Sequence, residues 1–241
     1  MFLDIHSHIL HRIDDGSKGL DITLALMENM KSQGVTDIIV TPHFDPLAEE
    51  LNYFETVRNE RYRELKEALK QYPALPNVYL GCEMLYYKGI SSASSLKSFM
   101  LGNTDYILLE PRPGMINETF LGEITALKEK GIIPIIAHIE RYRGERGYKK
   151  FIEFIAENNI KTQINAAAFT ERYYIRAIKK LQKQNIITFL ASDTHSPEKR
   201  PPLIQFALTK ITELFGKEYA DTLILNSQVL LNELKSKENA E

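Results

Sequence analysis

The chain has 241 residues, and its 30 basic and 32 acidic side chains give a formal net charge of −2 at pH 7. This balance gives no electrostatic case for binding nucleic acid or an anionic membrane surface. The single cysteine, Cys82, excludes an intrachain disulfide framework and favours a reducing compartment. No apolar run approaches the roughly 20 residues of a membrane span. The first apolar run already begins at residue 2, which leaves no room for a signal peptide. We therefore expect a cytoplasmic protein.

Seven short apolar runs along the chain are typical of buried parallel strands. They cover residues 2–8, 38–43, 78–83, 107–110, 135–138, 160–166 and 186–193. Helix-like segments are predicted between or after them at residues 20–30, 48–72, 120–130, 148–158, 173–184, 201–215 and 219–234. Gly34 and Gly131 end the first and third of these helices. The serine-rich stretch 91–98 precedes the fourth strand, and the polar tail 235–241 is expected to fray.

The alternation of strands with helices favours a parallel β/α barrel over a mixed sheet. No linker or change of composition divides the chain, so we predict one domain over residues 1–241. A chain of this size buries roughly 70–75% of the surface that it exposes when unfolded.

Six of the predicted strands end in, or just before, a histidine or a carboxylate. The residues concerned are His6, His8, His43, Glu83, Glu110, His138, Asp193 and His195. His6 and His8 are two apart on one strand, so both side chains project to one face, about 6.8 Å apart along the backbone. Asp193 and His195 repeat this spacing at the last strand. Strand-end residues satisfied only by hydrogen bonds are the alternative, but six such ends in one chain favour a metal site at the mouth of a barrel.

The carboxylates refine this prediction. Glu83 and Glu110 follow apolar runs, and a buried glutamate needs a cation or a strong partner to stay ionised. Two or three divalent ions would supply that charge. Asp15 in the loop after the first strand is the preferred further ligand, whereas Asp14 is equally suited to a cap or turn. Asp4 is interpreted as structural. Mixed imidazole and carboxylate ligands suit Zn, Mn or Fe.

Two other side chains are not expected to coordinate a metal ion or to act as a nucleophile. His11 falls in a loop without a paired ligand, so we expect it to be solvated or to face a substrate. Cys82 would need an arginine six residues later to resemble a cysteine phosphatase, but Lys88 is found there. We therefore expect Cys82 to be a small buried apolar residue.

Arg141 and Arg200 are the candidate substrate-binding residues. Arg141 follows His138 by three positions and Arg200 follows Asp193 by seven, so both belong to loops that leave metal-bearing strands. A guanidinium is a natural bidentate partner for a phosphoryl group. Surface ion pairing is the usual alternative for an arginine. If Arg141 and Arg200 bind phosphate, we expect that neither of them is needed to hold a metal ion.

These residues resemble the polymerase and histidinol phosphatase (PHP) superfamily, and within it the bacterial CpsB/CapC-type protein-tyrosine phosphatases. The matching motifs are Asp4-Ile5-His6-Ser7-His8, Asp14-Asp15-Gly16, Thr41-Pro42-His43, Gly81-Cys82-Glu83, Glu110, His138-Ile139-Glu140-Arg141-Tyr142 and Ser192-Asp193-Thr194-His195. They span residues 4 to 200. The long segment 48–72 has no detailed match, and its contribution to substrate contacts is left open.

The resemblance implies a distorted seven-stranded (β/α)7 TIM-like barrel with three divalent ions, usually Mn, with Fe or Zn as alternatives. The implied ligands are His6, His8, Glu83 and Asp193 for one ion, Glu83, Glu110 and His138 for a second, and Asp15, His43 and His195 for a third. Arg141 and Arg200 match the arginines that contact phosphate. The implied reaction is hydrolysis of phosphotyrosine by a metal-activated water, on a bacterial tyrosine kinase tail that controls capsule or exopolysaccharide synthesis.

Three alternatives follow from the same residues. A small-molecule phosphatase such as histidinol phosphatase would use the same metals with a tighter pocket. A metal-stabilised module could bind a phosphorylated kinase tail without turnover. An amidohydrolase barrel also contains His-x-His, but it usually needs a lysine at a strand end, and we find none at the predicted ends.

Overall fold

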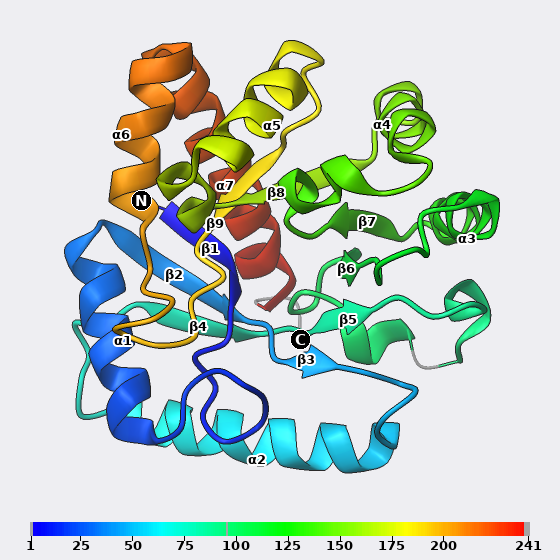
Figure 1. Cartoon of the computed structure of the whole chain (residues 1–241). Coiled ribbons are helices and arrows are strands. Elements are labelled where there is room, and N and C mark those ends of the chain that lie inside the picture. Colours follow the sequence, from blue (N-terminus) through cyan, green and yellow to red (C-terminus); the bar gives the residue numbers. More distant parts are fainter. Residues whose placement is uncertain (1, 95, 239–241) are drawn as a thin grey trace.

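The computed structural model describes residues 2–94 and 96–238 and shows a mixed α/β fold built on curled parallel sheets (Figure 1). The described strands are β1 (Phe2–Ser7), β2 (Val35–Val40), β3 (His43–Phe44), β4 (Asn77–Leu80), β5 (Glu83–Leu85), β6 (Tyr106–Glu110), β7 (Ile133–Ile136), β8 (Lys161–Asn165) and β9 (Phe189–Ala191). One sheet has the order β1-β2-β4 and the other β3-β5-β6-β7-β8-β9. A parallel bridge between Ser7 and Thr194 joins β1 to the segment after β9.

Two of the predicted strands are each interrupted after their first part. Pro42, which has no backbone N–H, lies between β2 and β3. Gly81 lies between β4 and β5, where a Cβ would come within 2.7 Å of Ile39 Cγ2. Backbone hydrogen bonds still cross the gap, because Gly81 N donates to Val40 O and Glu83 N to Pro42 O. Nine strand segments therefore occupy the positions of the seven predicted runs.

The helices follow the predicted order, and all of them except the last lie around the outside of the sheets, whereas the last helix lies in the middle of the molecule against the strands (Figure 1). They are α1 (Leu20–Ser32), α2 (Leu51–Leu69), α3 (Glu118–Glu129), α4 (Tyr148–Glu157), α5 (Arg172–Lys183), α6 (Ile204–Phe215) and α7 (Lys217–Glu238). Short 3-10 helices are η1 (Ile90–Ser92), η2 (Leu96–Phe99), η3 (Ile139–Gly144) and η4 (Ala166–Thr170). Gly34 and Gly131 have φ of 86° and 80°, which explains why the preceding helices end there. In the described part of the chain, no helix is long and apolar enough to cross a membrane.

The C-terminal helix differs from the prediction. Residues 235–238 continue α7 instead of fraying, and residues 239–241 lie outside the described part of the chain. Lys235 Nζ lies 3.2 Å from Asp37 Oδ1 on β2, and Lys237 Nζ lies 2.8 Å from Asp105 Oδ2 just before β6. These ion pairs link the end of α7 to the amino-terminal parts of the strands.

The core has two parts that follow the alternation of strand side chains. Leu3 and Ile5 of β1 belong to a smaller cluster with Leu230, Leu231 and Leu234 of α7. The larger cluster fills the space between the strands and the surrounding helices. α7 packs against β1 and β9, and its end reaches the amino ends of strands, so the carboxyl ends are left for polar side chains.

Candidate metal centre

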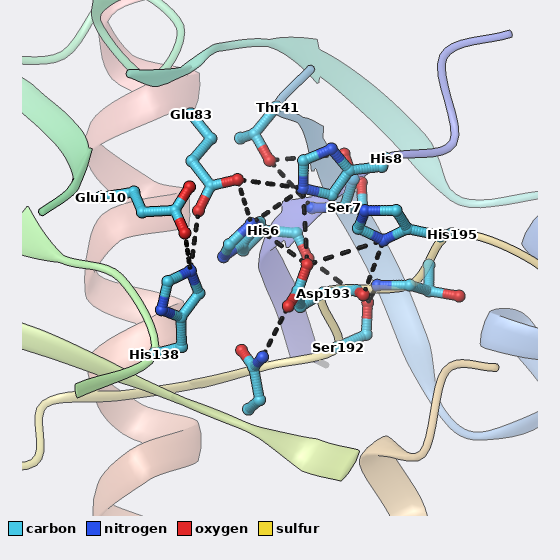
Figure 2. A network of polar contacts seen from close by, with 12 residues as sticks. His6, Ser7, His8, Thr41, Glu83, Glu110, His138, Ser192, Asp193 and His195 are labelled. Carbon is cyan, nitrogen blue, oxygen red and sulfur yellow. Dashed lines mark hydrogen bonds and ion pairs between the residues drawn. The ribbon is translucent and has the colours of Figure 1, made fainter. Parts of the chain in front are cut away.

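All nine predicted ligands lie at, or just beyond, the carboxyl ends of strands, and the structure brings them together. Figure 2 shows how His6, His8, Glu83, Glu110, His138, Asp193 and His195 converge from separate strands. Eight of the nine side chains are buried or half-buried, and Asp15 is exposed in the loop after β1. Parallel strands explain this convergence, because their carboxyl ends meet at one side of the sheet.

The first group of ligand atoms surrounds His6 and His8. Their Nε2 atoms are 3.0 Å apart. Glu83 Oε2 lies 3.2 Å from each of them, and Asp193 Oδ1 lies 3.5 Å from His6 Nε2 and 3.4 Å from His8 Nε2. Two imidazole nitrogens and two carboxylate oxygens thus face one point, which is the donor set that a small divalent cation requires.

Glu83 also belongs to a second group, with Glu110 and His138. His138 Nε2 lies 3.1 Å from Glu83 Oε1 and 3.4 Å from Glu110 Oε1. His43 Nδ1 approaches the same pair from the other side, at 2.9 Å from Glu83 Oε2 and 3.9 Å from Glu110 Oε2. The two oxygens of Glu83 therefore face different groups, as a bridging carboxylate would.

The third group lies around Asp15. His195 Nε2 lies 3.2 Å and His43 Nε2 3.7 Å from Asp15 Oδ1. The ring of His8 is next to both, with centroids 4.0 Å from His195 and 4.4 Å from His43. His43 thus presents one ring nitrogen to Asp15 and the other to Glu83, so it lies between the second and third groups.

Among the described residues, three buried atoms in these groups lack a hydrogen-bond partner, which bears on whether the residues fit metal ions. Glu83 Oε2, His43 Nδ1 and His195 Nε2 make no hydrogen bond within the described structure, although nitrogen or oxygen atoms lie close to each. A buried polar atom without a partner is costly. Such atoms are expected at a metal site, because metal ligands point toward the ion and not toward one another. The residues present therefore fit a cluster of divalent cations.

The electrostatics of the site couple cation binding to proton release. Burial acts to lower the pKa of His138, but the hydrogen bonds that its protonated ring donates to Glu110 and Glu83 dominate and raise the pKa to about 9. Burial likewise acts to raise the pKa of Glu83, but the neighbouring histidines hold it well below its usual range. A histidine must be deprotonated to bind a metal through Nε2. Cation binding is therefore expected to displace a proton from His138.

Tight backbone turns place two of the ligands. His138 and Asp193 have φ of 34° and 51°, a left-handed conformation that is uncommon for residues other than glycine. β9 ends at Ala191, so Asp193 and His195 lie beyond the strand and not on it as predicted. Their convergence comes from the turn at Asp193 and from the hydrogen bond that Asp193 N donates to His6 O.

Asp14 has a role that the sequence did not indicate. Its Oδ1 accepts from Gly16 N at 2.8 Å, which confirms the predicted turn. Its Oδ2 lies 2.7 Å from His8 Nδ1. The carboxylate thus orients the imidazole so that Nε2 faces the first group, as carboxylates do for many metal-binding histidines.

Three further orienting residues were missed by sequence reasoning. Gln163 Oε1 lies 3.1 Å from His6 Nδ1, and it accepts from His138 N at 2.9 Å. Asn165 Nδ2 donates to Asp193 Oδ2 at 2.6 Å, and the Tyr142 hydroxyl lies 3.2 Å from His138 Nδ1. Gln163 and Asn165 could have been found from the sequence, because they are two apart at the end of β8 and so share one face. This was the one predicted strand to which no site residue had been assigned.

Arg141 and Arg200 converge on one carboxylate oxygen. The Nη2 atom of each donates to Asp193 Oδ2 at 2.8 Å, while Arg200 Nη1 lies 3.8 Å from Asp15 Oδ2. Both side chains are partly exposed. Both arginines contact the candidate ligand Asp193, and the prediction that neither is needed to hold an ion stays a prediction. These contacts place both guanidinium groups beside the candidate ligands.

The structure contradicts the first of the two alternatives for His11, that it is solvated, and confirms the prediction for Cys82, while the alternative that His11 faces a substrate stays a prediction. His11 is buried, and its Nε2 lies 2.8 Å from Glu64 Oε2 on α2, so it is not solvated. Glu64 in turn accepts hydrogen bonds from Arg61. Cys82 is fully buried, and burial raises the pKa of its thiol far above the ordinary value. Such a thiol does not act as a nucleophile at neutral pH.

Comparisons with known proteins agree with this site. The family described as "Capsular polysaccharide synthesis, CpsB/CapC" matches residues 2–232. The chain is 30% identical over 243 residues to the tyrosine-protein phosphatase CpsB of Streptococcus agalactiae, covering 95% of this chain and 98% of that protein. It is 29% identical over 237 residues to the tyrosine-protein phosphatase YwqE of Bacillus subtilis, covering 95% and 91%.

Solved structures show the same similarity. A crystal structure from work on YwqE of Bacillus subtilis and CpsB of Streptococcus pneumoniae, described as unique metal-dependent tyrosine phosphatases, matches with a TM-score of 0.85. That match has 27% identity and covers 95% of this chain and 94% of the other. A chain in an archaeal ribonuclease P structure shares the fold alone, with a TM-score of 0.58 and 14% identity. Because the family match extends over nearly the whole length, the chain belongs to the CpsB/CapC family.

Proposed function

We propose that this protein is a metal-dependent protein-tyrosine phosphatase. The observation that carries the proposal is the convergence of nine imidazole and carboxylate side chains beside two arginines that share Asp193. The relatives named tyrosine-protein phosphatases support the same reaction over 95% of this chain.

We propose three ions, most simply Mn, in the following sites. One is held by His6, His8, Glu83 and Asp193, a second by Glu83, Glu110 and His138, and a third by Asp15, His43 and His195. The interatomic distances support this division, with Glu83 shared by the first two sites. His43 and His8 each contact two groups, so they are placed to link the sites.

The fold and domain proposals rest on the strand arrangement. If β2 with β3 and β4 with β5 are each one interrupted strand, the nine segments make the seven strands of a distorted (β/α)7 barrel. The bridge from Ser7 to Thr194 supports closure between the first strand and the last. We propose a single domain over residues 1–241, since one large core cluster includes residues from Phe2 to Leu223.

The residues around the cluster have separate tasks in phosphoester hydrolysis. Bound divalent ions supply positive charge and a water of lowered pKa. Arg141 and Arg200 bind phosphoryl oxygens and stabilise the charge that develops on them. Asp193 holds both guanidinium groups in place through Oδ2. Tyrosine is a favourable leaving group, because its phenol has a pKa of about 10, so a strong general acid is not essential.

For the physiological substrate we propose a phosphotyrosine-containing protein, specifically the tail of a bacterial tyrosine kinase that controls capsule or exopolysaccharide synthesis. The family description, capsular polysaccharide synthesis, supports this choice.

The test is a comparison of substrates with the Mn-reconstituted protein. We expect turnover of a phosphotyrosyl peptide with a kcat/KM well above that for histidinol phosphate. A preference for histidinol phosphate would favour the small-molecule phosphatase instead. Tight binding of the peptide without release of phosphate would identify a binding module and overturn the enzymatic proposal.

A further inference from the structure

The exposed face of α5 carries an unbalanced positive charge. The helix contains no acidic residue, and its exposed basic residues are Arg172, Arg176, Lys179, Lys180 and Lys183. At 100° per residue these side chains fall on one stripe of the helix. Within residues 2–94 and 96–238, none of the five makes an ion pair with a carboxylate. By contrast, Lys217 and Lys237 of α7 each pair with an aspartate.

The first turn of α5 lies close to the candidate metal centre. β8 ends at Asn165, which hydrogen-bonds Asp193, and η4 connects it to α5. α5 packs against η3, the 3-10 helix that carries Arg141 and Arg143 (Figure 1). The guanidinium carbon of Arg143 lies 5.4 Å from the ring centroid of Tyr173, whose side chain is 49% exposed. These contacts place the first turn of α5 against Arg143, which follows Arg141 by two residues in η3.

We call the surface formed by Arg143, Arg172, Tyr173 and Arg176 the basic rim. Few carboxylates of the described chain lie near it. Glu140 is buried and faces Asn165 N. Glu145 accepts from Gly114 N and so is turned toward another loop. Glu171, immediately before α5, is the nearest exposed carboxylate in the sequence. Because the whole chain has a net charge of −2, the positive charge of the rim is local.

We propose that the basic rim binds anionic residues that flank the phosphotyrosine of a substrate peptide. The proposal rests on the proposed phosphatase function. A peptide whose phosphotyrosine lies beside Arg141 brings its neighbouring residues within reach of Arg143 and Tyr173. Arginine binds carboxylates and phosphates in the same bidentate manner, and the exposed Tyr173 ring adds an apolar contact surface. The ligand is therefore an anionic peptide segment, with acidic residues or a second phosphorylated residue as sources of the charge.

The experiment compares kcat/KM for three phosphotyrosyl peptides of equal length on the Mn-reconstituted protein. One has neutral flanking residues, one has aspartate and glutamate, and one has a phosphoserine. Each exposed ion pair between the basic rim and the peptide is weak. Two or three such pairs should together lower KM for the two anionic peptides by about tenfold relative to the neutral peptide. Arg172→Gln/Arg176→Gln should remove most of this preference. Raising the ionic strength should do so too, because the Debye length falls to about 3 Å at 1 M salt.

Lys183→Gln is the control, since it removes one positive charge from the same stripe, about 16 Å from Arg172 and about 10 Å from Arg176 along α5. It should leave the preference unchanged. The proposal is overturned if wild-type protein treats neutral and acidic peptides alike, or if Lys183→Gln acts as strongly as Arg172→Gln/Arg176→Gln. It is also overturned if the double variant keeps the peptide preference but loses binding to phosphatidylserine vesicles, which would identify a membrane-binding surface. Failure of wild-type protein to hydrolyse any of the three peptides would instead contradict the proposed function.

Discussion

Asp193 is the residue at which metal binding and substrate binding meet. Its Oδ1 faces His6 and His8, while its Oδ2 accepts hydrogen bonds from Arg141, Arg200 and Asn165. Burial acts to raise the pKa of Asp193, but the histidines and Arg141 lower it further than burial raises it. The carboxylate is therefore charged at neutral pH, whether or not a phosphoryl group is bound.

Removal of either arginine should impair catalysis more than folding. Arg141→Ala and Arg200→Ala each delete a preorganised donor group, a loss of about 2.7–4 kcal/mol or a hundred- to thousandfold in kcat/KM on a phosphotyrosyl peptide. Lysine should substitute poorly, because an ammonium lacks the planar fork. Since both arginines contact Asp193, metal affinity should also fall, though the cluster should still load at saturating Mn. Arg63→Ala on the surface of α2 is the control, and wild-type kinetics in either test variant would contradict a phosphate-binding role for that arginine.

Cys82 should be dispensable for the reaction. Its thiol is fully buried and its pKa is raised by burial, so the reactive thiolate is scarce in the folded state. Iodoacetamide should label native protein slowly and urea-unfolded protein fast, and the native protein should stay active during that incubation. Cys82→Ser should retain kcat within about tenfold, because removal of a true acid–base or nucleophilic group costs about a hundredfold or more. A larger loss with metal content retained would assign a chemical role to the cysteine.

Residue type decided which parts of the site were predictable. Histidines and carboxylates stand out at the ends of apolar runs, so the nine candidate ligands were predicted to lie close together, and the structure places them close together. Gln163 and Asn165 were missed because amides at a strand end are chemically unremarkable without their partners. His11 was misjudged because Glu64, the partner that buries it, lies 53 residues away in the sequence.

At the scale of elements, the loop from His8 to Ser17 holds Asp14 and Asp15 over the centre. Ser17 N donates to His8 O, and Arg12 N to Ser17 O, which closes the loop on itself. Gly16 lies inside the loop that these hydrogen bonds close. A Cβ at position 16 would lie only 2.0 Å from His8 O and 2.7 Å from His8 Cβ. The loop therefore has no room for a side chain at this position.

Gly16→Ala should consequently displace the loop and its two aspartates. We expect lower Mn content, lower activity and a lower Tm. Gly122→Ala is the control, because Gly122 lies within α3 with no atom near its missing Cβ. Alanine there should leave activity intact and stabilise the helix by up to about 1 kcal/mol. Wild-type metal content in Gly16→Ala would show that the loop does not position the ligands.

The order of the elements was predictable, but their ends and interruptions were less so. Apolar runs and glycine stops located the described α-helices and the regions of the described strands in sequence, but they did not indicate the 3-10 helices. The break between β2 and β3 lies at Pro42, which the sequence shows, but the break at Gly81 involves a close approach to Ile39, which is distant in the sequence. The extension of α7 depends on the ion pairs of Lys235 and Lys237 with residues far away in the sequence.

At the scale of the whole molecule, metal binding should be coupled to stability. The candidate ligands belong to six of the seven predicted strands or to the loops after them, and they are drawn together only in the folded state. Bound ions therefore stabilise that state by mass action, by about 2.7 kcal/mol for one site at a hundred times its Kd. A strong chelator should therefore lower the Tm and abolish activity, and Mn should restore both. An unchanged Tm after removal of all metal, verified by elemental analysis, would show that the ions do not hold the strand ends together.

The most direct test of the metal centre is X-ray diffraction from crystals of the Mn-reconstituted protein, measured on both sides of the Mn absorption edge. The account predicts three anomalous peaks. One should lie between His6, His8, Glu83 and Asp193, the second between Glu83, Glu110 and His138, and the third between Asp15, His43 and His195. Absence of peaks at these positions, or Mn bound only at surface carboxylates elsewhere, would contradict the central claim.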